Sequence, residues 1–198
     1  MMKSDSPRHA EVSRRTAETD ITLALLLDGE GAADINTGLP FFDHMLAQTA
    51  RHGGVDLSLR AAGDLRVDGH HTVEDCGLAL GRALRQALGD KIGIARFGHA
   101  FAPLDESLSR VVVDLSGRPS LTYHVSLAQN TVGGMEADLL REFFQALANS
   151  GEVTLHVDLL RGLNAHHQAE SLFKAFGLAL KMAVMRVGGG LPSTKGVL

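Results

Sequence analysis

The pattern of two histidines followed by a glutamate occurs twice in the sequence, as His70-His71-Thr72-Val73-Glu74 and as His166-His167-Gln168-Ala169-Glu170. The two copies lie 96 residues apart, and each is followed by an apolar run with helical spacing. Aligned without gaps, residues 70–84 and 166–180 are identical at seven of fifteen positions. One copy would be a weak signal, because any helix that contains histidine can produce it. Two copies with matching helices behind them predict an internal duplication.

The spacing within each copy places metal-ligand side chains on two faces of one helix. Residues four apart share a helical face, so the first histidine of each copy converges with the glutamate of that copy. The second histidine points about 100° away around the helix. Nitrogen and oxygen ligands without thiolate fit Mn, Fe, Co, Ni or Zn. A single copy would more simply be a polar helix N-terminus that water solvates, but two equivalent copies favour a pair of metal ions.

The duplication extends beyond the histidine pairs. A shift of 88 residues aligns two turns that end predicted strands, and it places Glu18 on Glu106. A shift of 98 residues aligns two later strands, and it places His44 on Glu142. His44 alone would be interpreted as a helix-surface histidine. Its equivalence to a carboxylate that can bind a metal makes both residues candidate ligands.

The repeated order of elements predicts an α+β fold made of two tandem βαβ-type halves, each a sheet covered by helices on one face. We expect a single catalytic domain, residues 1–198, with halves at about 10–92 and 93–187 and a phosphate-binding tail at 188–198. The expected strands are residues 19–27, 55–60, 110–115, 121–127 and 152–159, the expected helices are residues 40–52, 70–88, 135–149 and 167–187, and residues 1–15 and 30–38 are expected to be irregular.

Composition narrows the class of protein. A net charge of −4 without a long basic run gives no support to a nucleic-acid or membrane-surface partner. The single cysteine, Cys76, excludes an internal disulfide and indicates a reducing compartment. No segment approaches the roughly 20 apolar residues that span a bilayer, and the N-terminus lacks a signal segment. These features predict a cytoplasmic protein.

Cationic and hydroxyl side chains outside the histidine copies are candidates for binding a phosphate: Arg96, Arg118, Lys174 and the tail segment Ser193-Thr194-Lys195-Gly196. Arginine can contact phosphate through two N–H groups, and lysine with hydroxyls and free backbone N–H groups can complete a cradle. The tail lacks the glycine frame of a P-loop. Each lone arginine is equally consistent with a solvated surface group, so only the tail indicates function by itself.

Five stretches of the chain resemble the imidazoleglycerol-phosphate dehydratase family of histidine biosynthesis: Phe42-Asp43-His44-Met45-Leu46, Asp68-Gly69-His70-His71-Thr72-Val73-Glu74-Asp75, His166-His167-Gln168-Ala169-Glu170, Phe173-Lys174-Ala175-Phe176 and Pro192-Ser193-Thr194-Lys195-Gly196. The resemblance covers nearly the whole chain from about residue 10. It implies a metal-dependent hydro-lyase that converts D-erythro-imidazole glycerol phosphate into imidazole acetol phosphate. It also implies a 24-subunit homo-oligomer with active sites between subunits and two Mn(II) ions in each site.

The resemblance assigns roles residue by residue. The implied metal ligands are His44, His70, His71, Glu74, His166, His167 and Glu170. The implied substrate contacts are Glu18, Gln48, His52, Arg96, Arg118, Lys174, Ser193 and Lys195. One position departs from the family, because many members carry histidine where this chain has Glu142. A carboxylate can replace an imidazole at Mn(II), and the repeat aligns Glu142 with His44, so Glu142 stays a candidate ligand.

The mechanism is a hypothesis at this point. Metal ligation would favour the imidazolate form of the substrate ring, and a carboxylate would move the proton that leaves carbon. Glu18 is the expected proton shuttle, with Glu74 and Glu170 as second choices because metal ligation occupies them. The alternative functions are a metal-dependent hydrolase and a non-catalytic metal-binding oligomeric shell.

Overall fold

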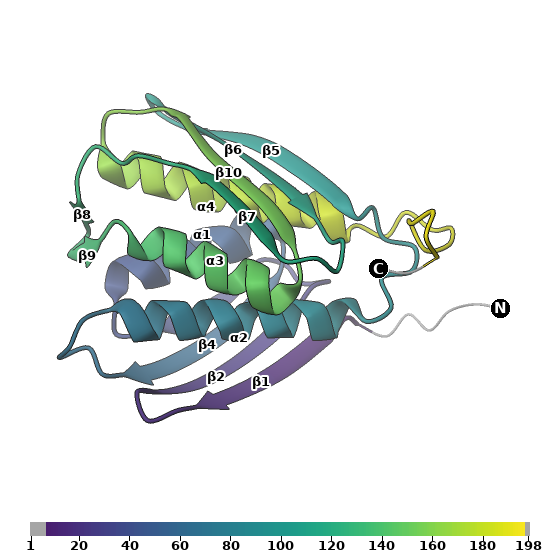
Figure 1. Cartoon of the computed structure of the whole chain (residues 1–198), viewed down its shortest axis with the longest axis horizontal. Helices are drawn as coiled ribbons and strands as arrows, with labels where there is room; N and C mark the ends of the chain where they lie inside the picture. Colours follow the sequence, from purple (N-terminus) through teal and green to yellow (C-terminus); the bar gives the residue numbers. More distant parts are fainter. Residues whose placement is uncertain (1–6, 197–198) are drawn as a thin grey trace.

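The computed structural model describes residues 7–196 and contains two four-stranded sheets (Figure 1). The first half contains β1 (His9–Arg15), β2 (Thr19–Leu26), β3 (Ala33–Asn36), α1 (Pro40–Gly53), β4 (Asp56–Gly63) and α2 (His70–Leu88). The second half contains β5 (Phe97–Leu104), β6 (Ser107–Asp114), β7 (Ser120–His124), β8 (Thr131–Val132), β9 (Met135–Glu136), α3 (Leu139–Gly151), β10 (Thr154–Arg161) and α4 (Ala165–Val184).

The two sheets have the same topology. The strand orders are β1-β2-β4-β3 and β5-β6-β10-β7. In each sheet the last strand of that order pairs parallel with its neighbour, and a helix connects the two, which makes β3-α1-β4 and β7-α3-β10 equivalent βαβ units. The remaining pairs in each sheet are antiparallel. The predicted α+β fold of two βαβ-type halves is therefore confirmed.

The helices lie between the two sheets, which form the outer layers of the molecule (Figure 1). Helix α2 covers the inner face of the first sheet, and α4 covers the inner face of the second. The first helix of each half packs against the second helix of the other half, so that α1 contacts α4 and α3 contacts α2. Five phenylalanines are fully buried in this layer and form its core: Phe42, Phe143, Phe144, Phe173 and Phe176.

Glycines bring the paired helices into backbone contact. A Cβ atom at Gly177 of α4 would lie 2.7 Å from the carbonyl oxygen of Thr49 in α1, and one at Gly81 of α2 would lie 2.5 Å from the carbonyl oxygen of Leu147 in α3. Gly81 and Gly177 are equivalent in the repeat, so the two crossings have the same geometry. In both pairs the helices run parallel, which brings their N-terminal turns together.

Five strands lie where the sequence analysis placed none: β1, β3, β5 and the two short strands β8 and β9. Residues 9–15 and 33–36 form β1 and β3, so the prediction of irregular chain there was wrong, and β5 was not predicted. In β1 the buried residues Ala10 and Val12 alternate with exposed polar residues, and Arg14, on the same face as the buried pair, reaches Asp75 at 2.8 Å. This composition resembles a loop because an edge strand needs only one apolar face. Residues 1–6 and 197–198, which belong to the expected irregular start and tail, lie outside the described residues.

One helix boundary also differs from the prediction. Helix α3 begins at Leu139 instead of residue 135, because Met135 and Glu136 pair with Thr131 and Val132 in a hairpin that the first half lacks. Helices α1, α2 and α4 begin and end within a few residues of their predicted limits. Across residues 7–196, no helix combines the length and the apolar character that crossing a membrane would require.

Candidate metal centre and active site

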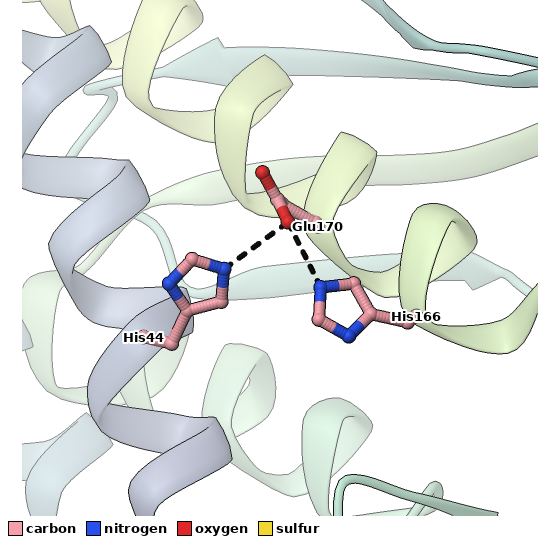
Figure 2. A group of neighbouring side chains, drawn as sticks. All are labelled: His44, His166 and Glu170. Atoms are coloured by element: carbon pink, nitrogen blue, oxygen red, sulfur yellow. Dashed lines mark hydrogen bonds and ion pairs between the residues drawn. The ribbon is translucent and has the colours of Figure 1, made fainter.

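Three side chains converge where α1 crosses the start of α4 (Figure 2). The Nε2 atoms of His44 and His166 lie 3.1 Å and 3.0 Å from the same carboxylate oxygen, Oε2 of Glu170. His166 and Glu170 are four residues apart on α4, and His44 reaches them from α1. One ligand atom from each residue lies within 4.8 Å of the others. Two nitrogens and one oxygen at this separation fit a divalent first-row metal.

Glu170 carries a negative charge into this cluster. Its side chain is only 11% exposed, and its second oxygen accepts a hydrogen bond of 2.8 Å from Nζ of Lys174. Burial by itself raises the pKa of Glu170, but hydrogen bonds from Lys174, His44 and His166 outweigh it and hold the pKa at about 2. The carboxylate is therefore ionised at neutral pH, as a metal ligand needs to be.

The equivalent crossing of α2 and α3 does not gather its candidate ligands. Among residues 7–196, the side chains of His70, Glu74 and Glu142 form no compact group of ligand atoms. The carboxylate of Glu142 instead accepts a hydrogen bond of 3.1 Å from Arg141. His44 can donate a hydrogen bond to the glutamate that it faces, whereas the carboxylate at the equivalent position, Glu142, has no N–H group to donate.

The second histidine of each copy is held by a carboxylate from a preceding loop or strand end. Nδ1 of His71 lies 3.0 Å from Asp64, and its Nε2 lies 3.6 Å from the Glu18 carboxylate. Nδ1 of His167 lies 2.8 Å from Glu106. The carboxylates of Asp64 and Glu106 accept hydrogen bonds from the two histidines, which raises the pKa values of those histidines. Sequence analysis aligned Glu106 with Glu18 without giving it a role, and it missed Asp64, because no helical or strand spacing links Asp64 to His71.

The candidate substrate contacts fall into two groups, and the first group surrounds the cluster of Figure 2. Lys174 contacts Glu170 directly. Burial lowers the pKa of His52, and the positive charge of Lys174 lowers it further, so this imidazole is close to the lysine. Gln48 lies on α1 between His44 and His52 and is half-buried.

The second group lies at the opposite end of α4. Backbone N–H of Arg96 donates to the carbonyl of Ala183, near the last turn of the helix. The Arg96 guanidinium donates to both oxygens of Asp114 and to the carbonyl of Pro192, so it holds the C-terminal segment in place. Arg118 lies 3.9 Å from the same Asp114 carboxylate. A helix of 20 residues is about 30 Å long, so this group is far from His166 within one chain.

The structure thus brings together some predicted site residues and separates others. The ones that meet are His44, His166, Glu170 and Lys174, and in a second contact His71 and Glu18. The ring of His70 lies edge-on to that of His71, with centroids 6.0 Å apart. Within the described residues, the ones that join neither contact include Glu74, Glu142, Arg96, Arg118, Ser193 and Lys195. His167 lies beside Glu106, which the prediction did not include in the site.

Comparisons with known proteins fit this geometry. A family model described as imidazoleglycerol-phosphate dehydratase matches residues 37–180. Curated proteins of that name from Bordetella petrii and Thiobacillus denitrificans are 58% and 59% identical over 194 residues, which is 96% of this chain and 100% of each relative.

Solved structures agree with the sequence relatives. The imidazoleglycerol-phosphate dehydratase of Staphylococcus aureus matches with a TM-score of 0.81 and 38% identity, over 90% of this chain and 99% of its own. The structure of the Pyrococcus furiosus enzyme in complex with (S)-C348 matches with a TM-score of 0.82 and 38% identity, over 94% and 100%. The chain therefore belongs to the imidazoleglycerol-phosphate dehydratase family of enzymes.

Proposed function

We propose that the chain dehydrates D-erythro-imidazole glycerol phosphate to imidazole acetol phosphate in histidine biosynthesis, at a site that holds two Mn(II) ions. The observation that carries this proposal is the convergence of His44, His166 and Glu170 beside Lys174, in a chain of this family. The same composition that disfavours membrane and nucleic-acid partners leads us to propose a cytoplasmic enzyme that acts on a small phosphorylated imidazole.

The residues present suit the metal. His44, His166 and Glu170 would hold one ion, because their ligand atoms already lie within 4.8 Å of one another. We propose that the remaining ligands are His70, His71, Glu74, Glu142 and His167. When bound, a divalent cation would supply Lewis-acid stabilisation of negative charge on an imidazole ring.

One chain does not supply a whole active site in this proposal. The phosphate-binding candidates lie at one end of α4 and the histidine cluster at the other, a separation of roughly 25 Å by helix length. That distance is too long for a substrate with only three carbons between ring and phosphate. We therefore propose a homo-oligomer of 24 subunits, in which Arg96, Arg118, Ser193 and Lys195 of one subunit bind the phosphate next to the histidines of another.

Glu18 is the proposed proton shuttle. Its carboxylate is 52% exposed and lies 3.6 Å from Nε2 of His71, the nitrogen that would bind the metal. The Glu18 carboxylate is therefore open to solvent and close to the proposed metal site. Glu18 accepts the proton from the carbon adjacent to the one that bears the leaving hydroxyl, and passes it to that hydroxyl, which leaves as water. The enol that results tautomerises to the ketone. Glu74 and Glu170 are the second choices, since a carboxylate bound to a metal is a weaker base.

The test is incubation of the purified protein and Mn(II) with imidazole glycerol phosphate. A dehydratase forms imidazole acetol phosphate, a hydrolase releases inorganic phosphate, and a metal-holding shell leaves the substrate unchanged. Release of phosphate without the ketone would overturn the proposal. The oligomer is tested separately by light scattering before and after metal is removed with a chelator, where we expect a large particle that becomes smaller.

A further inference from the structure

The two halves hold their second histidines with carboxylates from different places in the repeat. His71 is held by Asp64, which directly follows β4, and His167 is held by Glu106, which directly precedes β6. The residue that precedes β2, and so corresponds to Glu106, is Glu18. The two halves therefore perform the same contact with residues that are not equivalent.

The second half has no carboxylate at the position that corresponds to Asp64. Strand β10 contains a register shift between Leu159 and Arg161, which makes Gly162 the counterpart of Gly63. The counterpart of Asp64 is therefore Leu163, whose exposed side chain cannot accept a hydrogen bond. In this half Glu106 holds the imidazole instead.

We propose that Asp64 and Glu106 are positioning residues of the metal centre, and that Asp64 leaves Glu18 free to move protons. Each carboxylate accepts a hydrogen bond from Nδ1–H of its histidine, at 3.0 Å for Asp64 and 2.8 Å for Glu106. A neutral imidazole with its proton on Nδ1 keeps the Nε2 lone pair for a metal. The inference rests on the proposed function in one respect, that His71 and His167 bind metal.

The first half shows the consequence for Glu18. The backbone N–H of Asp64 donates to the Glu18 carbonyl at 3.1 Å, so the two residues flank one imidazole from neighbouring chain segments. Asp64 is at Nδ1, whereas Glu18 is 3.6 Å from Nε2, on the side where a ligand would bind. If Asp64 were absent, Glu18 would be the nearest carboxylate left to hold the ring. Its carboxylate would then be occupied, as the Glu106 carboxylate is.

The two oxygens of Glu106 accept hydrogen bonds from different partners, so a single substitution can remove the contact to His167 and keep the contacts to the backbone. Oε1 accepts backbone N–H groups of Leu163 and Asn164 at 3.0 Å and 2.8 Å, in the turn before α4, and Oε2 accepts from His167. In Glu106→Gln the amide oxygen can keep the two backbone contacts. The amide NH₂ then faces Nδ1 and can only donate, which forces the histidine proton onto Nε2.

The experiment compares wild type, Glu106→Gln and Asp64→Asn by Mn(II) titration and by solid-state ¹⁵N NMR of metal-free protein labelled at histidine. We expect each variant to lose about 10- to 100-fold in Mn(II) affinity at one class of site. In Glu106→Gln, whose amide oxygen stays on the backbone N–H groups, we also expect the His167 imidazole to move its proton from Nδ1 to Nε2, a change that a purely structural role would not produce. Glu11→Gln, an exposed carboxylate on the outer face of β1, is the matched control.

The possible outcomes distinguish the positioning role of Asp64 and Glu106 from the metal-ligand role of His71 and His167. If His167→Ala weakens Mn(II) binding but Glu106→Gln and Asp64→Asn change neither affinity nor tautomer, the positioning role is wrong and the ligand role stands. If His167→Ala and His71→Ala both keep full Mn(II) affinity, both ideas fail. Should Glu106→Gln not fold, Asp64→Asn decides, because within residues 7–196 the Asp64 carboxylate contacts His71 and supports no backbone N–H.

Discussion

The crossing of α1 with α4 and the crossing of α2 with α3 have the same backbone geometry but different charges. The first places His44 and Lys174 around one buried glutamate. At the equivalent positions the second has Glu142 and Leu78, so a carboxylate replaces the imidazole and an apolar side chain replaces the ammonium. At the first crossing hydrogen bonds gather His44, His166 and Glu170, whereas at the second Glu142 accepts a hydrogen bond from its neighbour Arg141. The duplicated fold supplies equivalent positions, and a few side chains decide what each can bind.

The largest expected effect comes from the two glutamates that precede β2 and β6. Glu18→Gln should lower turnover by on the order of 10²–10⁴, because it removes the proton shuttle, while Mn(II) content and particle size stay unchanged. Glu106→Gln should instead lower Mn(II) affinity, so that added Mn(II) restores part of the lost rate. Steady-state kinetics at several Mn(II) concentrations separate the two. If added Mn(II) restored the rate of both variants equally, Glu18 and Glu106 would not have the different roles that are proposed for them.

The equivalence of the two helix crossings is tested by adding one methyl group to each. Gly81→Ala and Gly177→Ala should each destabilise the protein by about 2 kcal/mol, because the new Cβ atom meets backbone of the facing helix and the helices must separate. Urea unfolding midpoints measure the loss. Gly190→Ala is the control, since a Cβ atom there meets nothing within 4 Å. A large effect at only one crossing would show that the crossings are not equivalent.

The charge difference between the crossings predicts a dependence of stability on pH. Lys174→Met removes a donor to Glu170 and should lower the free energy of unfolding of the metal-free protein by about 1–2 kcal/mol at pH 7. The folded pKa of Glu170, about 2, is below its ordinary 4.5, so its stabilisation is present above pH 4.5 and is lost as pH falls toward 2.

The difference between wild type and Lys174→Met should therefore shrink below pH 4.5, which urea titrations between pH 7 and pH 3 would reveal. Leu78→Met, at the equivalent position of α2, is the matched control and should show little change at any pH. A constant difference across this range would mean that Lys174 stabilises the protein by packing and not through the Glu170 charge.

The smallest effect is expected from making the second crossing resemble the first. Glu142→His should strengthen Zn(II) binding by on the order of tenfold, because an imidazole suits zinc and removes the repulsion with Glu74. Isothermal titration with Zn(II) and Mn(II) measures the change, with Glu11→His on the outer face of β1 as control. Unchanged isotherms would remove Glu142 from the proposed ligands.

Much of the fold was predictable from the sequence, for identifiable reasons. The helices were predicted because their apolar faces and their ligands repeat with helical period, and the duplication followed from the two histidine copies. Strands β1 and β3 were missed because edge strands with one polar face resemble loops. The cluster of His44, His166 and Glu170 combines a spacing of four residues with a repeat equivalence, and both are visible in sequence.

The rest of the site depends on geometry that sequence spacing does not encode. Asp64 lies seven positions before His71, at the start of the irregular segment between β4 and α2, and no periodic rule predicts that contact. The sequence also predicted that Arg96 binds phosphate, but it did not show that the Arg96 guanidinium donates hydrogen bonds to Asp114 and to the carbonyl of Pro192. Its distance from the histidines follows from the length of α4, and this distance appears only once the chain is folded.

The exchanged pairing of the helices carries an evolutionary consequence. A single half on its own would leave α1 or α3 without the helix that covers it. Two separate copies of one repeat could make the same crossings, with the first helix of each copy across the second helix of the other. In a single chain the two repeats have separate sequences, so a residue such as His44 can differ from its counterpart Glu142.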